Sequence, residues 1–193
     1  MLILLPPSEG KTAAGGGHPL DLASLAFPRL TDARREVLTA LSKVSARSDA
    51  HAVLSVGHSL KDEVRRNIDL LEAPAAPAHS VYSGVLYDAL GYRSMTSAQK
   101  RKADAAVVVV SALWGAVSFA DAVPAYRLSM SVDLPGVGKL AAYWRARLTD
   151  VLGERAGEGL VIDCRSSTYA AVWAGPPQRT ASVNVFQERN GRL

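Results

Sequence analysis

The chain has 193 residues, of which 48% are hydrophobic and 21% are charged. That length suits one domain, 1–193, and the composition is too apolar for a disordered segment. A formal charge of +4 permits binding of a polyanion without requiring it. The single cysteine, Cys164, excludes an internal disulfide, and the four histidines are scattered without ligand-like spacing. We therefore expect no structural metal and no cofactor.

The start of the chain is apolar, but this run is short. Met1–Leu5 ends at a Pro-Pro pair and lacks the basic region and the cleavage site of a secretory signal. No apolar stretch in the sequence approaches the length that crosses a bilayer. We therefore expect a cytoplasmic protein with no membrane partner.

Several segments carry the periodicity of a strand or a helix, and their alternation predicts an α/β fold. Short apolar runs bounded by polar residues favour buried strands, whereas apolar residues at a spacing of three or four favour helices. We expect one compact domain of short buried strands with surrounding helices. In chain order, the predicted elements are a strand over Met1–Leu5, a helix capped by Thr31 or Asp32 that runs through Leu41, helices over Lys61–Leu71 and Ser97–Ala103, a strand over Ala105–Val110, a helix over Lys139–Leu152, a strand over Leu160–Asp163 and a half-exposed strand over Ser182–Phe186.

The segment Leu134–Ala142 has the pattern of the hairpin that opens the second helix of a helix-hairpin-helix. Gly136 and Gly138 would let the backbone approach a phosphate closely. The unpaired first amides of the following helix favour an anion, and Lys139 adds a full charge. Arg145 follows on the same helix and can extend the contact. These residues predict sequence-independent, salt-sensitive binding of the DNA backbone.

The predicted helix-hairpin-helix-like element covers about 121–152. A second interpretation stays open, because a Pro-Gly-Val-Gly loop often only starts a helix. In addition, Tyr126–Val132 is short for the first helix of such an element.

Other unusual segments are spread along the chain, namely Met1–Thr12, Val81–Gly84, Ser111–Gly115, Asp121 with Pro124–Met130, Tyr143–Trp144 and Asp163–Tyr169. Their order and spacing resemble the YaaA family of peroxide-stress proteins over essentially the whole chain. The resemblance implies a cytosolic bacterial protein that limits damage from hydrogen peroxide and is associated with low free iron. It also implies an unusual α/β fold, a helix-hairpin-helix element and DNA as partner. Family members continue into a segment with a lysine and an Arg-Gly pair, which this sequence does not contain.

Two groups of residues are candidates for binding a small molecule, such as a nucleobase or a phosphate. Ser8 and Lys11 follow the first predicted strand, where α/β proteins place ligand-binding groups. Lys11 can bind a phosphate or, if desolvated, act in catalysis, although it can also merely follow a turn. Tyr126 and Arg127 can together hold a carboxylate or phosphate. Alternatively, Asp121 forms an ion pair with Arg127 that holds a loop, or it orients Arg127 toward a ligand.

The third predicted strand ends near Cys164 and Ser166. If the strands are neighbours, these residues converge with Lys11, Tyr82 and Trp114 into one pocket. A peroxide-sensing cysteine needs exposure and a lowered pKa, so a small buried hydrophobe is the simpler interpretation of Cys164. Trp114 is more typical of a core than of a base-stacking platform.

Two functions are compatible with these patterns. The first is a DNA-binding protein of the peroxide stress response that grips the phosphate backbone and limits iron-driven damage indirectly. The second is an enzyme acting on a nucleobase or nucleoside, although the sequence names no reaction, and its candidate pocket consists of Lys11, Tyr82, Asp121, Arg127 and Ser166. Direct iron sequestration is disfavoured, because clustered histidine and carboxylate ligands are missing from the sequence.

Overall fold

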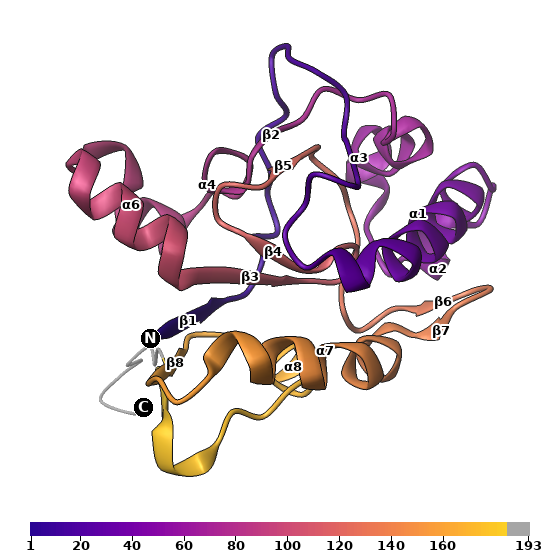
Figure 1. Ribbon diagram of the computed structural model, residues 1–193. Helices are drawn as coiled ribbons and strands as arrows, with labels where there is room; N and C mark the ends of the chain where they lie inside the picture. The colour runs from indigo at the N-terminus through magenta and orange to yellow at the C-terminus, as the bar shows by residue number, and fades with distance from the viewer. Residues whose placement is uncertain (185–193) are drawn as a thin grey trace, which may run out of the picture.

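The computed structural model describes residues 1–184. Its centre is a five-stranded sheet with the strand order β4-β3-β1-β8-β9 (Figure 1). β1 is parallel to both β3 and β8, β9 is parallel to β8, and β4 is antiparallel to β3. The α/β class is therefore confirmed. The strands of this sheet are β1 (Leu2–Leu5), β3 (Val107–Ser111), β4 (Gly115–Ser118), β8 (Val161–Asp163) and β9 (Thr180–Ser182).

Helices surround this sheet, and Figure 1 shows α7 below it and α6 to its left. The α-helices are α1 (Thr31–Ser45), α2 (Ala50–Val53), α3 (Lys61–Arg66), α4 (Ala78–Val81), α5 (Val85–Leu90), α6 (Ser97–Ala106), α7 (Leu140–Ala156) and α8 (Ser167–Ala170). Short 3₁₀ turns cover Pro28–Leu30, His58–Leu60, Asn67–Asp69, Tyr92–Ser94 and Pro177–Arg179. Two small antiparallel pairs complete the described part, β2 (Ala76–Pro77) with β5 (Ala122–Val123) and β6 (Asp133–Leu134) with β7 (Gly138–Lys139).

The central strands are the most apolar part of the chain. All five residues of β3 are buried, and β1 lies between β3 and β8 with Leu2 and Leu4 fully buried. A parallel sheet covered on both faces needs such continuous apolar strands, because neither face meets water. The three predicted buried strands are confirmed, each within two residues of its expected bounds.

Several predicted helices are confirmed with altered ends. Ser97–Ala103 extends to Ala106 and begins with a capping box of Thr96 and Gln99. The helix predicted over Lys61–Leu71 ends at Arg66 and continues as a 3₁₀ turn. The first helix has neither Thr31 nor Asp32 as its cap, because Leu30 occupies that position without a side-chain bond. The predicted strand Ser182–Phe186 lies partly outside the described residues, and the observed strand β9 ends at Ser182.

The helix-hairpin-helix prediction is wrong for its first helix. The chain from Pro124 to Met130 is extended or irregular, and the only helix of the predicted element within 121–152 is α7. Asn67 explains part of this conformation, since its side-chain oxygen accepts the amide of Arg127 at 2.8 Å and its nitrogen donates to the Arg127 carbonyl at 2.8 Å. The single amide proton of Arg127 is therefore already used, so Arg127 cannot donate the hydrogen bond that a helix would require of it.

Gly115 provides a test of how tightly α7 packs on the sheet. Its φ is +70°, and a Cβ at this position would lie 2.5 Å from a ring carbon of Trp144 on α7. We expect Gly115→Ala to lower the free energy of unfolding by roughly 1–3 kcal/mol, through overpacking and backbone strain. Urea denaturation measures this. The control Gly153→Ala lies in α7 with open space around it, so it should leave stability unchanged or raise it. Equal stabilities of the two variants would contradict the packing of Trp144 on Gly115.

Candidate functional site

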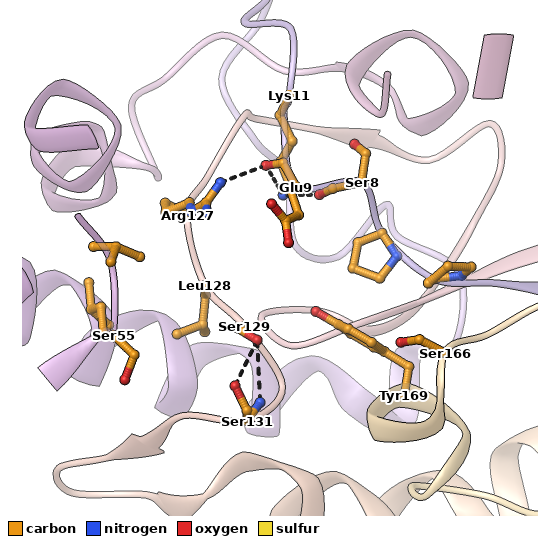
Figure 2. A pocket seen from close by; sticks show the side chains of 14 residues that line it. Ser8, Glu9, Lys11, Ser55, Arg127, Leu128, Ser129, Ser131, Ser166 and Tyr169 are labelled. Carbon is orange, nitrogen blue, oxygen red and sulfur yellow. Dashed lines mark hydrogen bonds between the residues drawn. The ribbon is translucent and has the colours of Figure 1, made fainter. Parts of the chain in front are cut away.

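A pocket of about 330 Å³ opens where β1 and β8 end (Figure 2). Its volume lies at the lower end of the range of about 300–1,000 Å³ found for small-molecule sites. Pro6–Glu9 and Lys11 after β1 form one wall, and Ser166 with Tyr169 after β8 forms another. The carboxyl ends of neighbouring parallel strands meet at one edge of a sheet, which explains why these segments converge. We call this cavity the Lys11 pocket; its remaining lining residues are Leu54–Val56, Arg127–Ser129 and Ser131.

The loop after β1 folds back on itself and fixes Lys11. The Lys11 ammonium nitrogen donates to the carbonyl of Ser8 at 2.7 Å and lies 3.5 Å from the carbonyl of Glu9. The loop is also tied to the segment after α4, because the Ser83 amide donates to Ser8 Oγ at 3.0 Å and the Thr12 amide to the Val81 carbonyl at 2.8 Å. The backbone on both sides of Lys11 is therefore anchored.

Two buried tyrosines form the floor beneath Lys11. The lysine nitrogen lies 4.5 Å from the ring centroid of Tyr126 and 5.7 Å from that of Tyr82. The two phenol oxygens are 3.1 Å apart, and Tyr126 also bonds to Ser111 Oγ at 2.6 Å. Ser111 Oγ accepts the backbone amides of Leu113 and Trp114, so its own proton is directed to Tyr126. This chain of hydrogen bonds fixes the aromatic floor at the end of β3.

The environment of Lys11 disfavours its charge. Burial and, to a lesser extent, the positive charge of Arg127 lower the pKa of Lys11 to about 7, against the opposing effect of Glu63 and Glu9. An unperturbed lysine has a pKa of about 10.4. About half of the Lys11 side chains are therefore neutral amines at pH 7.

Arg127 reaches the same loop from the irregular segment before β6. Its guanidinium donates to the Glu9 carbonyl at 3.0 Å and lies 3.6 Å from the carboxylate of Glu63. Its side chain is 19% exposed, so the charge is largely withdrawn from solvent but remains accessible from the pocket. Lys11 and Arg127 thus bring two cationic groups to one carbonyl oxygen, as Figure 2 shows.

Asp121 takes no part in this pocket, and both predicted relations between Asp121 and Arg127 are wrong. One carboxylate oxygen of Asp121 accepts the amides of Ala26 at 3.0 Å and Ser118 at 2.9 Å. Burial raises the pKa of Asp121, and these two hydrogen bonds and, to a lesser extent, the nearby Arg34 partly offset the rise. Asp121 therefore joins the segment before α1 to the end of β4, while Glu63 is the carboxylate that faces Arg127.

Behind Ser166, a buried ion pair holds the second wall. The Arg165 guanidinium bonds to both carboxylate oxygens of Asp163, at 2.8 and 2.7 Å. The same guanidinium donates to the carbonyls of Tyr169 at 3.1 Å and Trp173 at 2.7 Å. Because Arg165 contacts both ends of this turn, it fixes Ser166 and Tyr169 relative to β8.

Cys164 lacks the properties of a peroxide sensor. It is half-buried, and burial together with the negative charge of Asp163 raises the pKa of its thiol. A reactive cysteine needs the opposite shift, because the thiolate is the nucleophile.

The predicted phosphate cradle is a β-hairpin followed by α7. Gly136 and Gly138 both have a φ of +90°, and Gly136 and Lys139 are exposed. Two amides near this turn are already paired, because Val137 donates to Leu134 at 2.9 Å and the first helical residue, Leu140, donates to Val132 at 3.1 Å. Arg145 is exposed on α7, and its Nε donates to the Ala171 carbonyl at 2.8 Å.

The structure brings some predicted site residues together and separates others. Ser8, Lys11, Arg127 and Ser166 line one pocket. Tyr82 and Tyr126 lie buried beneath Lys11 instead of lining the cavity, and Trp114 is a core residue. Sequence reasoning missed Tyr169, Ser129, Ser131, Ser55 and Glu63. Tyr169 could have been predicted, since it lies three residues beyond Ser166 in the segment Asp163–Tyr169. No motif in the sequence marks Ser55 or Glu63.

Within residues 1–184, the acidic, histidine and cysteine side chains form no group of three or more that could hold a metal ion. No helix in that part of the chain combines the length and the apolar character needed to span a membrane.

The fold and the pocket define an α/β protein with a candidate ligand site at the carboxyl edge of a mixed sheet. The chain belongs to the family described as "Peroxide stress protein YaaA", whose model matches residues 1–193. A UPF0246 protein of Streptomyces coelicolor is 50% identical over 191 residues, covering 96% of this chain and 74% of the relative. UPF0246 proteins of Corynebacterium efficiens and Corynebacterium glutamicum are 44% and 39% identical, covering 95% and 100% of this chain and 74% and 77% of the relatives.

Proposed function

We propose that this protein binds DNA in the peroxide stress response by holding a backbone phosphate in the Lys11 pocket. The observation that carries the proposal is the convergence of Lys11 and Arg127 on the carbonyl of Glu9 within an open cavity. Two cations held this close repel each other, and this repulsion is the second cause, after burial, of the lowered pKa of Lys11. An anion between them would relieve it and would accept charge-assisted hydrogen bonds from both.

The surroundings of these two cations suit a phosphate. Ser129, Ser131 and Ser166 line the same cavity. The Ser129 and Ser131 hydroxyls are hydrogen-bonded to each other at 3.0 Å, so one of these two, together with Ser166, can donate to phosphate oxygens. The carboxylates of Glu9 and Glu63 oppose anion binding, so the site should favour a singly charged phosphodiester over a dianion. A phosphodiester is the repeating anionic group of DNA.

The β6–β7 hairpin is the second proposed contact. It begins at Asp133, two residues after Ser131 on the pocket rim, so the pocket and the hairpin belong to one continuous segment. Because two amides near the turn are already paired, we assign the hairpin's contribution mainly to the charges of Lys139 and Arg145. DNA held in this way would be bound without sequence preference, and any effect on iron-driven damage would be indirect.

Fluorescence anisotropy with a labelled duplex in a salt series tests DNA binding. We expect log affinity to fall linearly with log salt, and Lys139→Gln should reduce the slope by about 1. Lys43→Gln is the matched control, because Lys43 is an exposed lysine at the far end of α1. Binding without salt dependence would contradict the proposal. Equal slopes for the two variants would show that the hairpin does not contact DNA.

A second candidate is an enzyme that acts on a nucleobase or nucleoside in the same pocket. The lowered pKa of Lys11 favours it, because a general base or an amine nucleophile works best with a pKa near the operating pH. Since Asp121 and Tyr82 do not line the cavity, the residues available to a substrate are Lys11, Arg127, Ser166 and Tyr169. The test is to incubate the protein with each of the common nucleosides and to measure turnover. Turnover that is lost in Lys11→Met would support this candidate, and no turnover of any of these nucleosides would count against it.

A further inference from the structure

We propose that the Lys11 amine forms an imine with an aldehyde carried by a phosphate-bearing ligand. The substrate class is the ring-opened deoxyribose aldehyde of a nucleotide that has lost its base. The phosphate part of this inference rests on the proposed function, whereas the imine part rests on Lys11 alone.

The geometry around Lys11 suits a nucleophilic amine. A neutral amine has two N–H bonds and one lone pair. The carbonyls of Ser8 and Glu9, at 2.7 and 3.5 Å, accept those two N–H bonds. The ring face of Tyr126, 4.5 Å away, is electron-rich and repels the lone pair. The remaining direction is the cavity that Lys11 lines, so the lone pair faces the space where a ligand would sit.

The protonation state of Lys11 supports the same chemistry. With its pKa lowered to about 7 by burial and by Arg127, the amine is about half neutral at pH 7. A lysine with the ordinary pKa of about 10.4 is neutral in only about one molecule in 2,500 at that pH. Desolvation is a known way of preparing lysine for imine formation with carbonyl substrates.

The other pocket residues can supply the remaining steps. The Lys11 nitrogen attacks the aldehyde carbon, one proton moves from nitrogen to the carbonyl oxygen, and a carbinolamine forms. Protonation of its hydroxyl releases water and leaves the imine, so one amine and one aldehyde give one imine and one water. Burial raises the pKa of Tyr169, which keeps its phenol protonated as a donor at the pocket wall. Arg127 would hold the adjoining phosphate.

Reductive labelling of the native protein tests the inference. The methyl phosphodiester of glycolaldehyde is the probe, because its phosphate carries the single charge that the site should favour. Cyanoborohydride reduces any imine to a stable secondary amine, and peptide mass spectrometry locates it. At pH 7 we expect Lys11 to be labelled about 100-fold faster than the exposed Lys43 and Lys139. Equal labelling of the three lysines would overturn the imine. This comparison within one protein does not depend on whether any variant folds.

Two further arms separate this inference from DNA binding. Uncharged glycolaldehyde should label Lys11 at least tenfold more slowly than its methyl phosphodiester. Equal rates would be consistent with the imine but would contradict phosphate binding in the pocket.

A duplex with one base-free site should give a covalent complex with the protein after reduction, and an intact duplex should not. Lys11→Arg, with its thermal melting checked, should lose that complex, whereas Lys43→Arg should retain it. A complex that forms equally in Lys11→Arg would overturn the inference.

Discussion

Replacing Asp163 with alanine should lower the free energy of unfolding by about 3–5 kcal/mol, because it leaves the buried guanidinium of Arg165 without its carboxylate. The Arg165 side chain is fully buried and Asp163 is only 10% exposed, so water cannot replace the lost partner. Both oxygens of Asp163 accept from Arg165, and this pair adjoins the turn that carries Ser166 and Tyr169. Chemical denaturation monitored by tryptophan fluorescence measures the loss.

The control for this variant is Asp49→Ala, which breaks an equally short but half-exposed pair with Arg47. Solvent-exposed ion pairs contribute little to stability, so this variant should remain close to the parent. Equal stabilities of Asp163→Ala and Asp49→Ala would contradict the role of the Asp163–Arg165 ion pair in holding the second wall of the pocket.

Arg127→Gln should weaken binding of a short oligonucleotide about 10- to 100-fold, because hydrogen bonds to charged groups contribute roughly 1.5–3 kcal/mol each. The fold should survive, since Asn67 holds the backbone of Arg127 and not its side chain. The change also removes a positive charge beside Lys11, so the pKa of Lys11 should rise. Calorimetric titration with the oligonucleotide measures the affinity.

Arg29→Ala is the matched control for Arg127→Gln. Arg29 is an exposed arginine whose partner is Glu154 on α7, and it does not line the Lys11 pocket. Its loss should change the affinity less than twofold at moderate salt. Equal losses for the two variants would mean that the pocket contributes only general positive charge.

The strands of the core could be predicted because their signal is local. The valine run of β3 and the apolar start of β1 are short, continuous and bounded by polar residues. The convergence of Lys11 and Ser166 could be predicted on the condition that the strands preceding them are neighbours. The structure meets this condition, because β1 pairs with β8. The strand β4 was missed, because Gly115–Ser118 is too short to carry a period.

The errors arose where distant residues decide the structure. The segment around Arg127 is held out of a helix by Asn67, which lies 60 residues earlier. Asp121 accepts an amide from Ala26, 95 residues away, although Arg127 is much closer in the chain. Glu63, which faces Arg127, lies on α3 and has no motif around it. Sequence spacing carries no information about such contacts.

The pKa of Lys11, with and without ligand, tests the central claim most directly. Carbon-13 NMR of labelled lysine side chains follows each residue through a pH titration, and Lys11→Met assigns the resonance. We expect one lysine to titrate near pH 7, and its pKa to rise by at least about one unit when a dinucleotide phosphodiester binds, because the anion stabilises the ammonium form. Affinity should therefore decrease as the pH rises above 7. If every lysine titrated near pH 10.4, or if the ligand left the pKa of Lys11 unchanged, the Lys11 pocket would not be an anion site.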